Sequence, residues 1–424
     1  MKSFPKIFNT KISHHKSIKS LHIIFNGSGA VPTKLYPAVI SFINSLKSLK
    51  EISIAFEDDL SFNWTDLEQI SKAFKKMKRI TKFHISMDCF GLDPDLRFEE
   101  KTMKRFNARL QNFLLLKEFS FEFNIHPLSC SSISSLFKNL MKIKPLKIFR
   151  LILEGINDQT AASLCFGLKK LTTLESVILT LYSGVFEDDG VTGLVNEELF
   201  IDALKEIKSL ANFEFNYYFQ AVNPSAINQF FKRLSELENL KRLHLYTSAM
   251  NISDQSMINL AAGIKSMKKL NKLYIGFDGY VGFCEEKLET LSESLKTLRQ
   301  LNDFGLEIPG VMNARTHKLD GAWLNKLLRS LHKNLKYLNI TVRIPVIVTK
   351  EVKDLVVERL EDLNSLEKLI LSFMYTGENS RMMIDDLVEE VSEKLEYVTR
   401  EELRFEKYSE DFNCDDMSEN EEQW

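Results

Sequence analysis

The stretch from Leu237 to Leu245 has a leucine spacing that constrains the fold of the whole chain. Its leucines stand at positions 237, 240, 243 and 245, so two steps of three are followed by a step of two. Steps of three keep side chains on one side of a helix end or turn, whereas a step of two is the period of a strand with one buried face. The stretch therefore predicts a closing helix, a tight turn and a short strand.

This pattern is a true repeat, because it returns at a narrow interval. We take Leu240 as the anchor and require an apolar residue three and five positions later. Successive anchors then lie 28 to 36 residues apart. The anchors are Ile18, Leu49, Ile80, Leu116, Leu146, Leu174, Leu210, Leu240, Leu270, Leu301, Leu335 and Leu366, and Leu395 with Val398 forms a degenerate thirteenth. Amphipathic stretches such as Ser253–Ala261 lie between the anchors and predict one helix per repeat, here capped by Ser253.

The pattern resembles the leucine-rich repeat, and its length resembles the ribonuclease-inhibitor-like class, from about Ile18 to Leu395. The resemblance implies an α/β fold: a right-handed solenoid (horseshoe) of about 12–13 strand–helix repeats, with a parallel concave sheet and helices on the convex side. The family usually carries Asn or Cys eight residues after the anchor. Asn26 and Asn124 keep this feature and most other repeats do not, so more variable turns are expected.

The repeat also predicts the domain organisation. Residues 1–17 form a basic N-terminal lead or cap, residues 18–408 form the solenoid, and residues 409–424 form an acidic tail that is expected to be disordered. Within the solenoid, residues 400–408 are a candidate final strand or cap. Three repeats are longer, with insertions near residues 87–95, 182–196 and 308–320, and the second of these is a candidate binding loop.

Composition excludes several classes of function. Lys+Arg 56 against Asp+Glu 58 gives a net charge of -2, which argues against a general nucleic-acid binder but leaves room for a local basic patch. No apolar run approaches the length of a membrane helix, so no membrane partner is expected. Five scattered cysteines without a CxxC pair indicate reduced thiols and a cytoplasmic address, with the cytoskeleton or cilium as more specific alternatives.

Motifs of catalysis are missing from the sequence. It contains no P-loop, no HExxH and no GxSxG, and its histidines are spread over different repeats. The prediction is therefore a protein without enzymatic activity, cofactor or metal.

The candidate site lies on the strands of the seventh to ninth repeats. Side chains four and six positions after the anchor alternate with the buried ones, so they are expected on the concave face. Tyr and Arg are common in binding hot spots. The predicted protein-binding site consists of Glu214, Arg242, His244, Tyr246, Lys272 and Tyr274. The alternative is that an exposed sheet face simply carries mixed polar groups.

The resemblance implies a non-enzymatic scaffold that binds partner proteins through the concave face and inserted loops. One alternative is a structural subunit of a larger cytoskeletal or ciliary complex. Another is a ubiquitin-ligase-type substrate receptor, which would need an adaptor-binding segment before the repeats, where about 17 residues precede Ile18. An enzyme is the least favoured reading.

Overall fold

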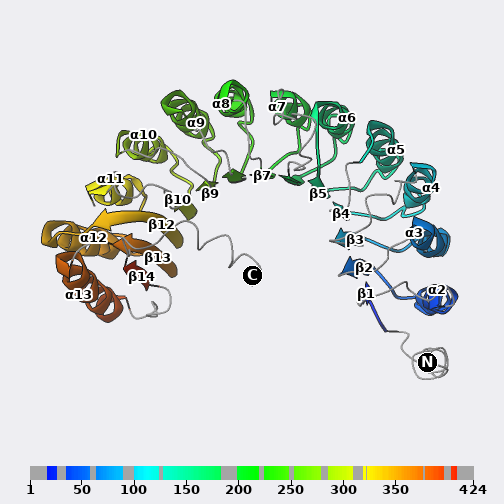
Figure 1. Ribbon diagram of the computed structural model, residues 1–424, viewed down its shortest axis with the longest axis horizontal. Coiled ribbons are helices and arrows are strands. Elements are labelled where there is room, and N and C mark those ends of the chain that lie inside the picture. The colour runs from blue at the N-terminus through cyan, green and yellow to red at the C-terminus, as the bar shows by residue number, and fades with distance from the viewer. Residues whose placement is uncertain are drawn as a thin grey trace, which may run out of the picture. The chain divides into compact units, whose positions relative to one another are not determined.

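A computed structural model describes residues 17–25, 35–57, 64–88, 100–123, 128–182, 198–218, 224–247, 253–277, 285–308, 319–320, 322–375, 378–395 and 403–407. The chain divides into two compact units, Met1–Phe215 and Asn216–Trp424. In each unit strands and helices alternate along the chain (Figure 1).

The first unit is built from strand–helix pairs, as the repeat predicts. Its elements are β1 Ser20–Phe25, α2 Leu35–Ser45, β2 Glu51–Glu57, α3 Trp64–Ser71, the 3-10 turn Lys72–Lys76, β3 Lys82–Asp88, α4 Glu100–Leu110, β4 Glu118–Phe123, α5 Cys130–Leu140, β5 Ile148–Glu154, α6 Asp158–Leu168, β6 Ser176–Tyr182, α7 Glu198–Lys205 and β7 Asn212–Tyr218. The last three residues of β7 belong to the second unit.

The second unit continues the same alternation. Its elements are α8 Pro224–Arg233, the 3-10 turn Leu234–Glu236, β8 Arg242–Thr247, α9 Asp254–Ser266, β9 Lys272–Phe277, α10 Glu285–Leu295, β10 Asp303–Ile308, β11 Leu319–Asp320, α11 Ala322–Ser330, β12 Tyr337–Ile347, α12 Lys350–Asp362, β13 Lys368–Tyr375, α13 Glu378–Lys394 and β14 Leu403–Lys407. Ser253 caps α9, and its side chain accepts a hydrogen bond from the Ser256 amide at 3.1 Å.

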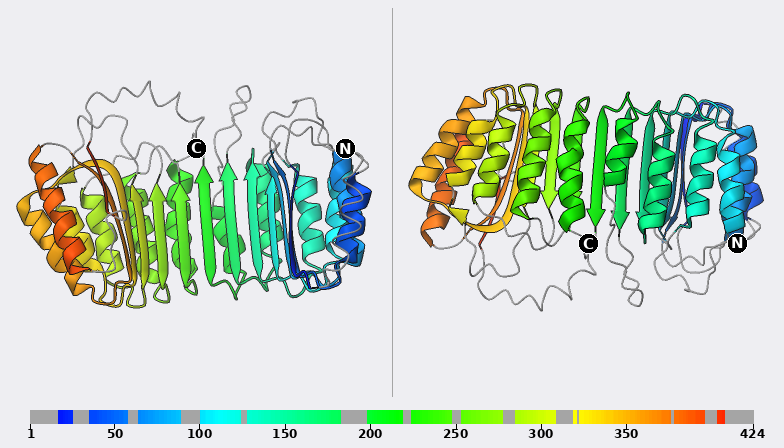
Figure 2. Two further views of the ribbon diagram at one scale, coloured as in Figure 1. Left: turned by 90° about the horizontal axis from the view of Figure 1, so that it is seen from below. Right: turned by 90° about the horizontal axis from the view of Figure 1, so that it is seen from above.

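The strands of each unit pair in parallel, in the register that the anchors predict. Leu243 and Leu245 of β8 face Leu273 and Ile275 of β9, so residues three and five after the anchor meet along the sheet. The same register joins β1 to β6 in the first unit and β9, β10, β12 and β13 in the second. Helices lie along one face of the sheet in each unit (Figure 2). We call the other face, which carries the residues four and six after the anchor, the open face.

Apolar side chains from the strands and helices fill the space between the two layers. In the first unit the position three after the anchor is occupied by Phe83, Phe119 and Phe149, whose ring centroids stand 6.0 and 6.1 Å apart on successive strands. All three are at most 1% exposed. Burial of each such side chain contributes roughly 1.5–3 kcal/mol. Because these side chains are buried against those of the next repeat, a single repeat depends on its neighbours for its stability.

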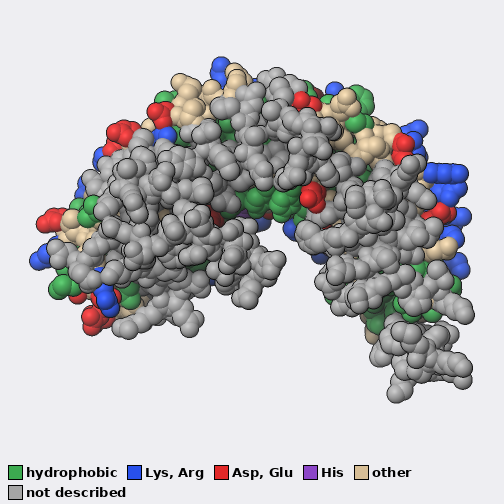
Figure 3. Space-filling model, in the orientation of Figure 1, with side chains coloured by type: hydrophobic (Ala, Val, Ile, Leu, Met, Phe, Trp, Pro, Cys, Tyr) green, Lys and Arg blue, Asp and Glu red, His purple; other side chains and the backbone are tan. Residues whose placement is uncertain are grey.

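Charged side chains lie over the helices. Figure 3 shows Lys and Arg side chains gathered at α3 and α4 of the first unit. Among the described residues, no helix combines the length and the apolar composition that crossing a bilayer requires.

The third insertion is partly built into the sheet. β11 pairs with residues Val346 and Ile347 at the end of β12, while β10 pairs with the first six residues of β12. The sequence did not predict this strand, because two residues are too few to show a period.

The final strand confirms one expectation and corrects another. β14 lies within residues 400–408 and pairs with β13 in parallel. However, its Leu403 faces Leu371, which lies five residues after the anchor Leu366. The thirteenth anchor position is therefore residue 398 and not Leu395, which follows α13 directly.

Several predictions concern residues outside the described ranges. They are the basic lead up to residue 16, the acidic tail at 409–424, Asn26 and Asn124, and most of the insertions near residues 87–95, 182–196 and 308–320. These remain predictions.

Candidate interaction surface on the open face of the sheet

Strands β8 and β9 place alternate side chains on the open face. In β8, Leu243 and Leu245 are buried, whereas Arg242 is exposed and His244 and Tyr246 are half-buried. β9 follows the same order, with Tyr274 half-buried between two buried residues. The alternation predicted from the anchors is therefore what directs these side chains outward.

Two glycines allow the tyrosines to lie flat on the sheet. A Cβ atom added to Gly276 would stand 2.3 Å from Tyr246 Cδ2 and 3.1 Å from Tyr274 Cε1. A Cβ atom added to Gly305 would stand 2.4 Å from Tyr274 Cδ2. Each ring thus occupies the space above a glycine of the next strand, where any other residue would carry a side chain.

Tyr274 is held from both sides. Its ring stacks on the imidazole of His244, with centroids 4.3 Å apart and planes 24° apart. Its hydroxyl donates a hydrogen bond to the Glu307 carboxylate. Burial, followed by this hydrogen bond and the negative charge of Glu307, raises the pKa of the Tyr274 hydroxyl, so the phenol stays protonated at neutral pH.

Tyr218 extends the group of rings. Its centroid lies 5.3 Å from that of Tyr246, and the two planes are inclined by 40°. We call Tyr218, His244, Tyr246 and Tyr274 the aromatic platform. Tyr218 was not predicted, because it lies eight residues after its anchor, outside the positions assigned to the concave face. Glu307, Gly276 and Gly305 were also missed, although they occupy the predicted rows.

The other three predicted residues, Arg242, Lys272 and Glu214, differ in their exposure and in the groups that they contact. Arg242 is exposed and pairs in register with Lys272. The Lys272 ammonium lies 2.5 Å from the Asp303 carboxylate and 5.7 Å from the ring centroid of Tyr337, so it is directed toward β10 and β12. Glu214 is half-buried on β7 and belongs to the first unit.

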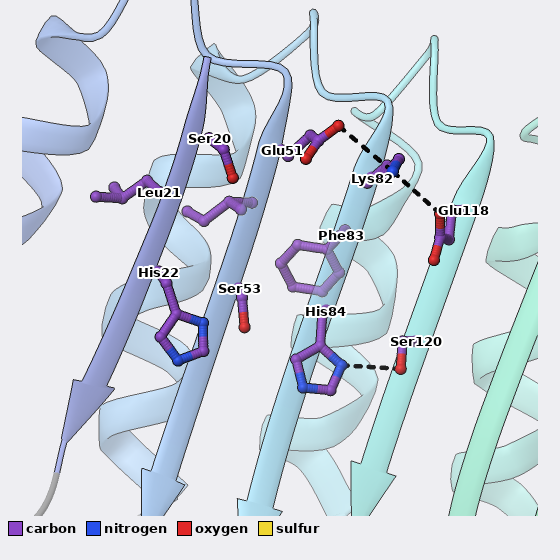
Figure 4. A pocket seen from close by; sticks show the side chains of 11 residues that line it. Ser20, Leu21, His22, Glu51, Ser53, Lys82, Phe83, His84, Glu118 and Ser120 are labelled. Atoms are coloured by element: carbon purple, nitrogen blue, oxygen red, sulfur yellow. Dashed lines mark hydrogen bonds and ion pairs between the residues drawn. The ribbon is translucent and has the colours of Figure 1, made fainter. Parts of the chain in front are cut away.

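The first unit has a separate hollow of about 200 Å³ on its open face, over β1 to β4. Figure 4 shows two rows of polar side chains along it. In the upper row, Lys82 Nζ lies 3.5 Å from Glu51 Oε1 and 3.8 Å from Glu118 Oε2. In the lower row His84 Nδ1 and Ser120 Oγ are 2.8 Å apart, and the buried Ser53 Oγ has no hydrogen-bond partner among the described residues.

The His84–Ser120 pair resembles the base and nucleophile of a hydrolase, but its electrostatics differ. Burial, then the positive charge of Arg150 and then that of His22, lower the pKa of the His84 imidazole. A catalytic base of this kind is normally oriented by a carboxylate that stabilises the protonated form. An arginine beside it has the opposite effect, so His84 is suited to hydrogen bonding and poorly suited to proton abstraction. No cluster of three or more metal-binding side chains occurs in the described part of the chain.

The anchors, their register and the helices between successive strands decide the fold. The chain folds as strand–helix repeats of the leucine-rich type. The leucine-rich repeats place one strand each in the parallel sheet of their unit, with the apolar positions three and five after the anchor beneath the helices. The candidate site is therefore a surface built from successive repeats.

No known family model matches the sequence, and no curated protein matches it. The chain is similar to several solved structures at low identity. A protein from Bacteroides fragilis is 16% identical over 66% of this chain and 73% of its own, with a TM-score of 0.37. The leucine-rich repeat-containing protein LegL7 from Legionella pneumophila is 13% identical over 82% and 90%, with a TM-score of 0.36. TLR13 in the TLR13–ssRNA13 complex is 12% identical over 89% and 60%, with a TM-score of 0.29.

Proposed function

We propose that this protein is a binding scaffold that holds a partner protein on the open face of its second unit. The observation that carries the proposal is the aromatic platform, in which Tyr246 and Tyr274 lie flat over Gly276 and Gly305. Partly exposed aromatic side chains on the face of a sheet are typical of binding hot spots.

The packing of the platform favours binding in a second way. His244 stacks on Tyr274, and Glu307 accepts its hydroxyl hydrogen bond, so the ring is ordered before any partner arrives. Ordering a flexible side chain on association costs about 0.5–1.5 kcal/mol, and a preformed ring avoids much of this cost. The exposed Arg242 beside the platform supplies charge at its rim.

The platform offers a partner mainly flat apolar surface. The Glu307 carboxylate already accepts from Tyr274, and Arg343 Nη2 lies 3.7 Å from its other oxygen. A partner therefore meets ring faces at the centre and charged groups at the edge, which is the usual anatomy of a protein interface. An apolar or aromatic side chain of the partner would pack on the rings.

The test begins with recovery of the partner from the protein's own cells by affinity purification and mass spectrometry. Binding of the purified partner to Tyr246→Ala and Tyr274→Ala is then measured by calorimetry. Each substitution should weaken binding about 30-fold, corresponding to loss of about 2 kcal/mol at a hot spot.

Ile258→Ala is the matched control, because Ile258 is 48% exposed on the helix α9 of the same unit and lies away from the sheet. It should leave the affinity within about twofold. Wild-type affinity in both tyrosine variants, with the fold retained by circular dichroism, would exclude the platform as the binding site.

A further inference from the structure

A basic edge runs along the first unit, where helices end and strands begin. The five turns at residues 46–50, 72–81, 111–117, 141–147 and 169–175 contain thirteen Lys or Arg residues and one acidic residue, Glu175. Lysine near a helix C-terminus is favoured by the helix dipole, which explains residues such as Lys75 and Lys76 in the last turn of their helix. It does not explain Lys142 and Lys144, which lie beyond α5.

Three apolar side chains protrude within this basic edge. Leu114, Leu115 and Met141 are 58%, 52% and 45% exposed. Leu114 and Leu115 lie in the turn between α4 and β4, between the buried residues Phe113 and Leu116. Exposing such side chains to water gains nothing for the fold.

The other repeats show that the fold does not require leucine at these two positions. The two residues before the anchor are Lys16 and Ser17, Lys47 and Ser48, Lys78 and Arg79, Lys144 and Pro145, Thr172 and Thr173, Lys208 and Ser209, Glu238 and Asn239, Lys268 and Lys269, Arg299 and Gln300, Lys333 and Asn334, and Asn364 and Ser365. All are polar or charged except Pro145. The leucine pair is therefore a local feature of one turn.

Leucines and lysines of two neighbouring turns lie side by side. Lys142 Nζ donates to Gln111 Oε1 at 2.9 Å, and the Lys147 amide donates to the Lys117 carbonyl at 2.8 Å. Within the described residues, Lys117, Lys142 and Lys144 form no ion pair. We call Leu114, Leu115, Lys117, Met141, Lys142 and Lys144 the Leu114 surface.

We propose that the Leu114 surface binds an anionic lipid bilayer, because it places protruding aliphatic side chains among lysines that form no ion pair with any described residue. The lysines pair with lipid phosphates and carboxylates, and Leu114, Leu115 and Met141 enter the boundary between headgroups and acyl chains. Such peripheral binding requires no membrane-spanning helix. It is independent of the aromatic platform, which lies in the other unit.

The chemistry favours a bilayer over a nucleic acid. Single-stranded nucleic acids gain affinity from aromatic rings on which bases stack, and the protruding residues of this surface are aliphatic. Lysine pairs with phosphate as a point charge and does not read base edges bidentately as arginine does. Burial of leucine and methionine is favourable in the hydrocarbon of a bilayer, whereas the charged backbone of a nucleic acid offers these side chains no such gain.

The test is flotation of the full-length protein with vesicles. One set contains phosphatidylcholine alone and the other contains phosphatidylcholine with about 30% phosphatidylserine, which gives the surface a negative potential. The protein should float with the anionic vesicles only, and less of it at about 0.3 M salt than at about 0.05 M, because salt screens the attraction.

Variants separate the two contributions to binding. Lys142→Gln/Lys144→Gln should weaken binding about 25-fold, from roughly fivefold for each lysine charge. Leu114→Ser/Leu115→Ser should weaken it about tenfold or more at unchanged charge. Lys265→Gln/Lys268→Gln is the matched control: it removes the same charge from exposed positions in the last turn of α9 and in the turn before β9, where no large apolar side chain is exposed. It should stay within about twofold of wild type.

Four results would overturn the proposal. They are equal flotation with both vesicle types, no flotation with either, an equal loss in the control variant, and wild-type binding by the leucine variant. A fifth outcome is tighter binding to a single-stranded RNA of about 20 nucleotides, abolished by the same lysine substitutions and insensitive to the leucines, which would assign the surface to nucleic acid.

Discussion

The ring of Tyr246 lies over Gly276, and a methyl group at that glycine would stand 2.3 Å from Cδ2 of the ring. Residues on two neighbouring strands thus share one space on the open face, and the smaller one determines where the larger one lies. Because Tyr246 is only half-buried, its ring can move outward if the space is filled.

Gly276→Ala should lift Tyr246 from the sheet and also displace Tyr274, whose Cε1 atom lies 3.1 Å from the same Cβ position. We expect near-ultraviolet circular dichroism to change, and affinity for the partner to fall by about tenfold, since the platform loses its order. Thermal stability should change by less than about 1 kcal/mol, because the rings relax toward solvent. An unaltered near-ultraviolet spectrum would contradict this account.

A glycine inside a helix should respond differently. A Cβ atom at Gly167 of α6 would stand 2.1 Å from Phe137 Cγ and 2.7 Å from Phe137 Cβ, and Phe137 is only 2% exposed. The clash with Phe137 should cost about 1–3 kcal/mol. Alanine gains about 1 kcal/mol over glycine in helix propensity, and the clash should outweigh this gain, so Gly167→Ala should destabilise the protein. Chemical denaturation measures the difference.

Gly263→Ala in α9 is the comparison for that prediction. Its nearest contacts would be Leu234 Cβ and Phe231 O, each at 3.0 Å, so the neighbours need to yield by only a few tenths of an ångström. We expect a change within about 1 kcal/mol of zero. If Gly263→Ala lowered the free energy of unfolding as much as Gly167→Ala, the close contact with Phe137 would not be the cause of the destabilisation.

The stability of the first unit should depend on the protonation of His84. Burial, with the charges of Arg150 and His22, lowers the pKa of His84 from its ordinary value of 6.5. A group that binds its proton less well in the folded chain favours folding while it is neutral. This contribution is fully present above pH 6.5 and is lost as the pH falls through the lower, folded-state pKa.

Urea denaturation between about pH 7 and pH 5 tests this dependence. His84→Gln should show a smaller decline of the free energy of unfolding with falling pH than the wild type. Parallel declines in the two proteins would exclude His84 as the group responsible.

An ion-pair network links α12 and α13 in the second unit. Glu390 lies 2.9 Å from Lys353 Nζ and 3.0 Å from Lys394 Nζ, and the side chain of Lys353 is 13% exposed. Hydrogen bonds from both lysines lower the pKa of Glu390, so its stabilisation is present at neutral pH and is lost in acid as the pH falls through that lowered pKa.

Glu390→Gln should therefore destabilise the protein by about 1 kcal/mol at pH 7, because a largely buried lysine loses its main partner. Glu389→Gln removes the same charge from an exposed neighbour with no ion pair in the described structure, and it should be neutral. Thermal unfolding at pH 7 and in acid should show a smaller difference between the two variants at the lower pH.

Much of the fold follows from the sequence, because the same pattern of buried apolar positions recurs in each repeat. Leu243 and Leu245 identify β8, and the matching residues of other repeats identify their strands and the register. The exceptions have physical causes. β11 is too short to show a period, and the thirteenth anchor was placed at Leu395 because that leucine continues the spacing, although the strand begins later.

The site was less accessible to sequence reasoning. Alternation predicts which face His244, Tyr246 and Tyr274 occupy, but the direction in which a ring leans depends on the size of the residue on the next strand. At Gly276 and Gly305 the missing side chain leaves the space that the rings occupy. This is visible only when residues on neighbouring strands are compared in register. The long side chain of Lys272 could reach several acidic partners, and its choice of Asp303 depends on geometry that spacing does not contain.

The alternation within β8 separates the residues that pack against the helices from the residues that are accessible to a ligand. Substitutions at Leu243 or Leu245 alter packing with the helices, whereas those at Arg242, His244 or Tyr246 alter only what the strand offers to a ligand. Because parallel strands repeat this division at every anchor, ligand specificity can diverge between related chains while the interior stays constant. Such a protein is also a suitable scaffold for library design, in which one half of each strand is randomised and the other half is left unchanged.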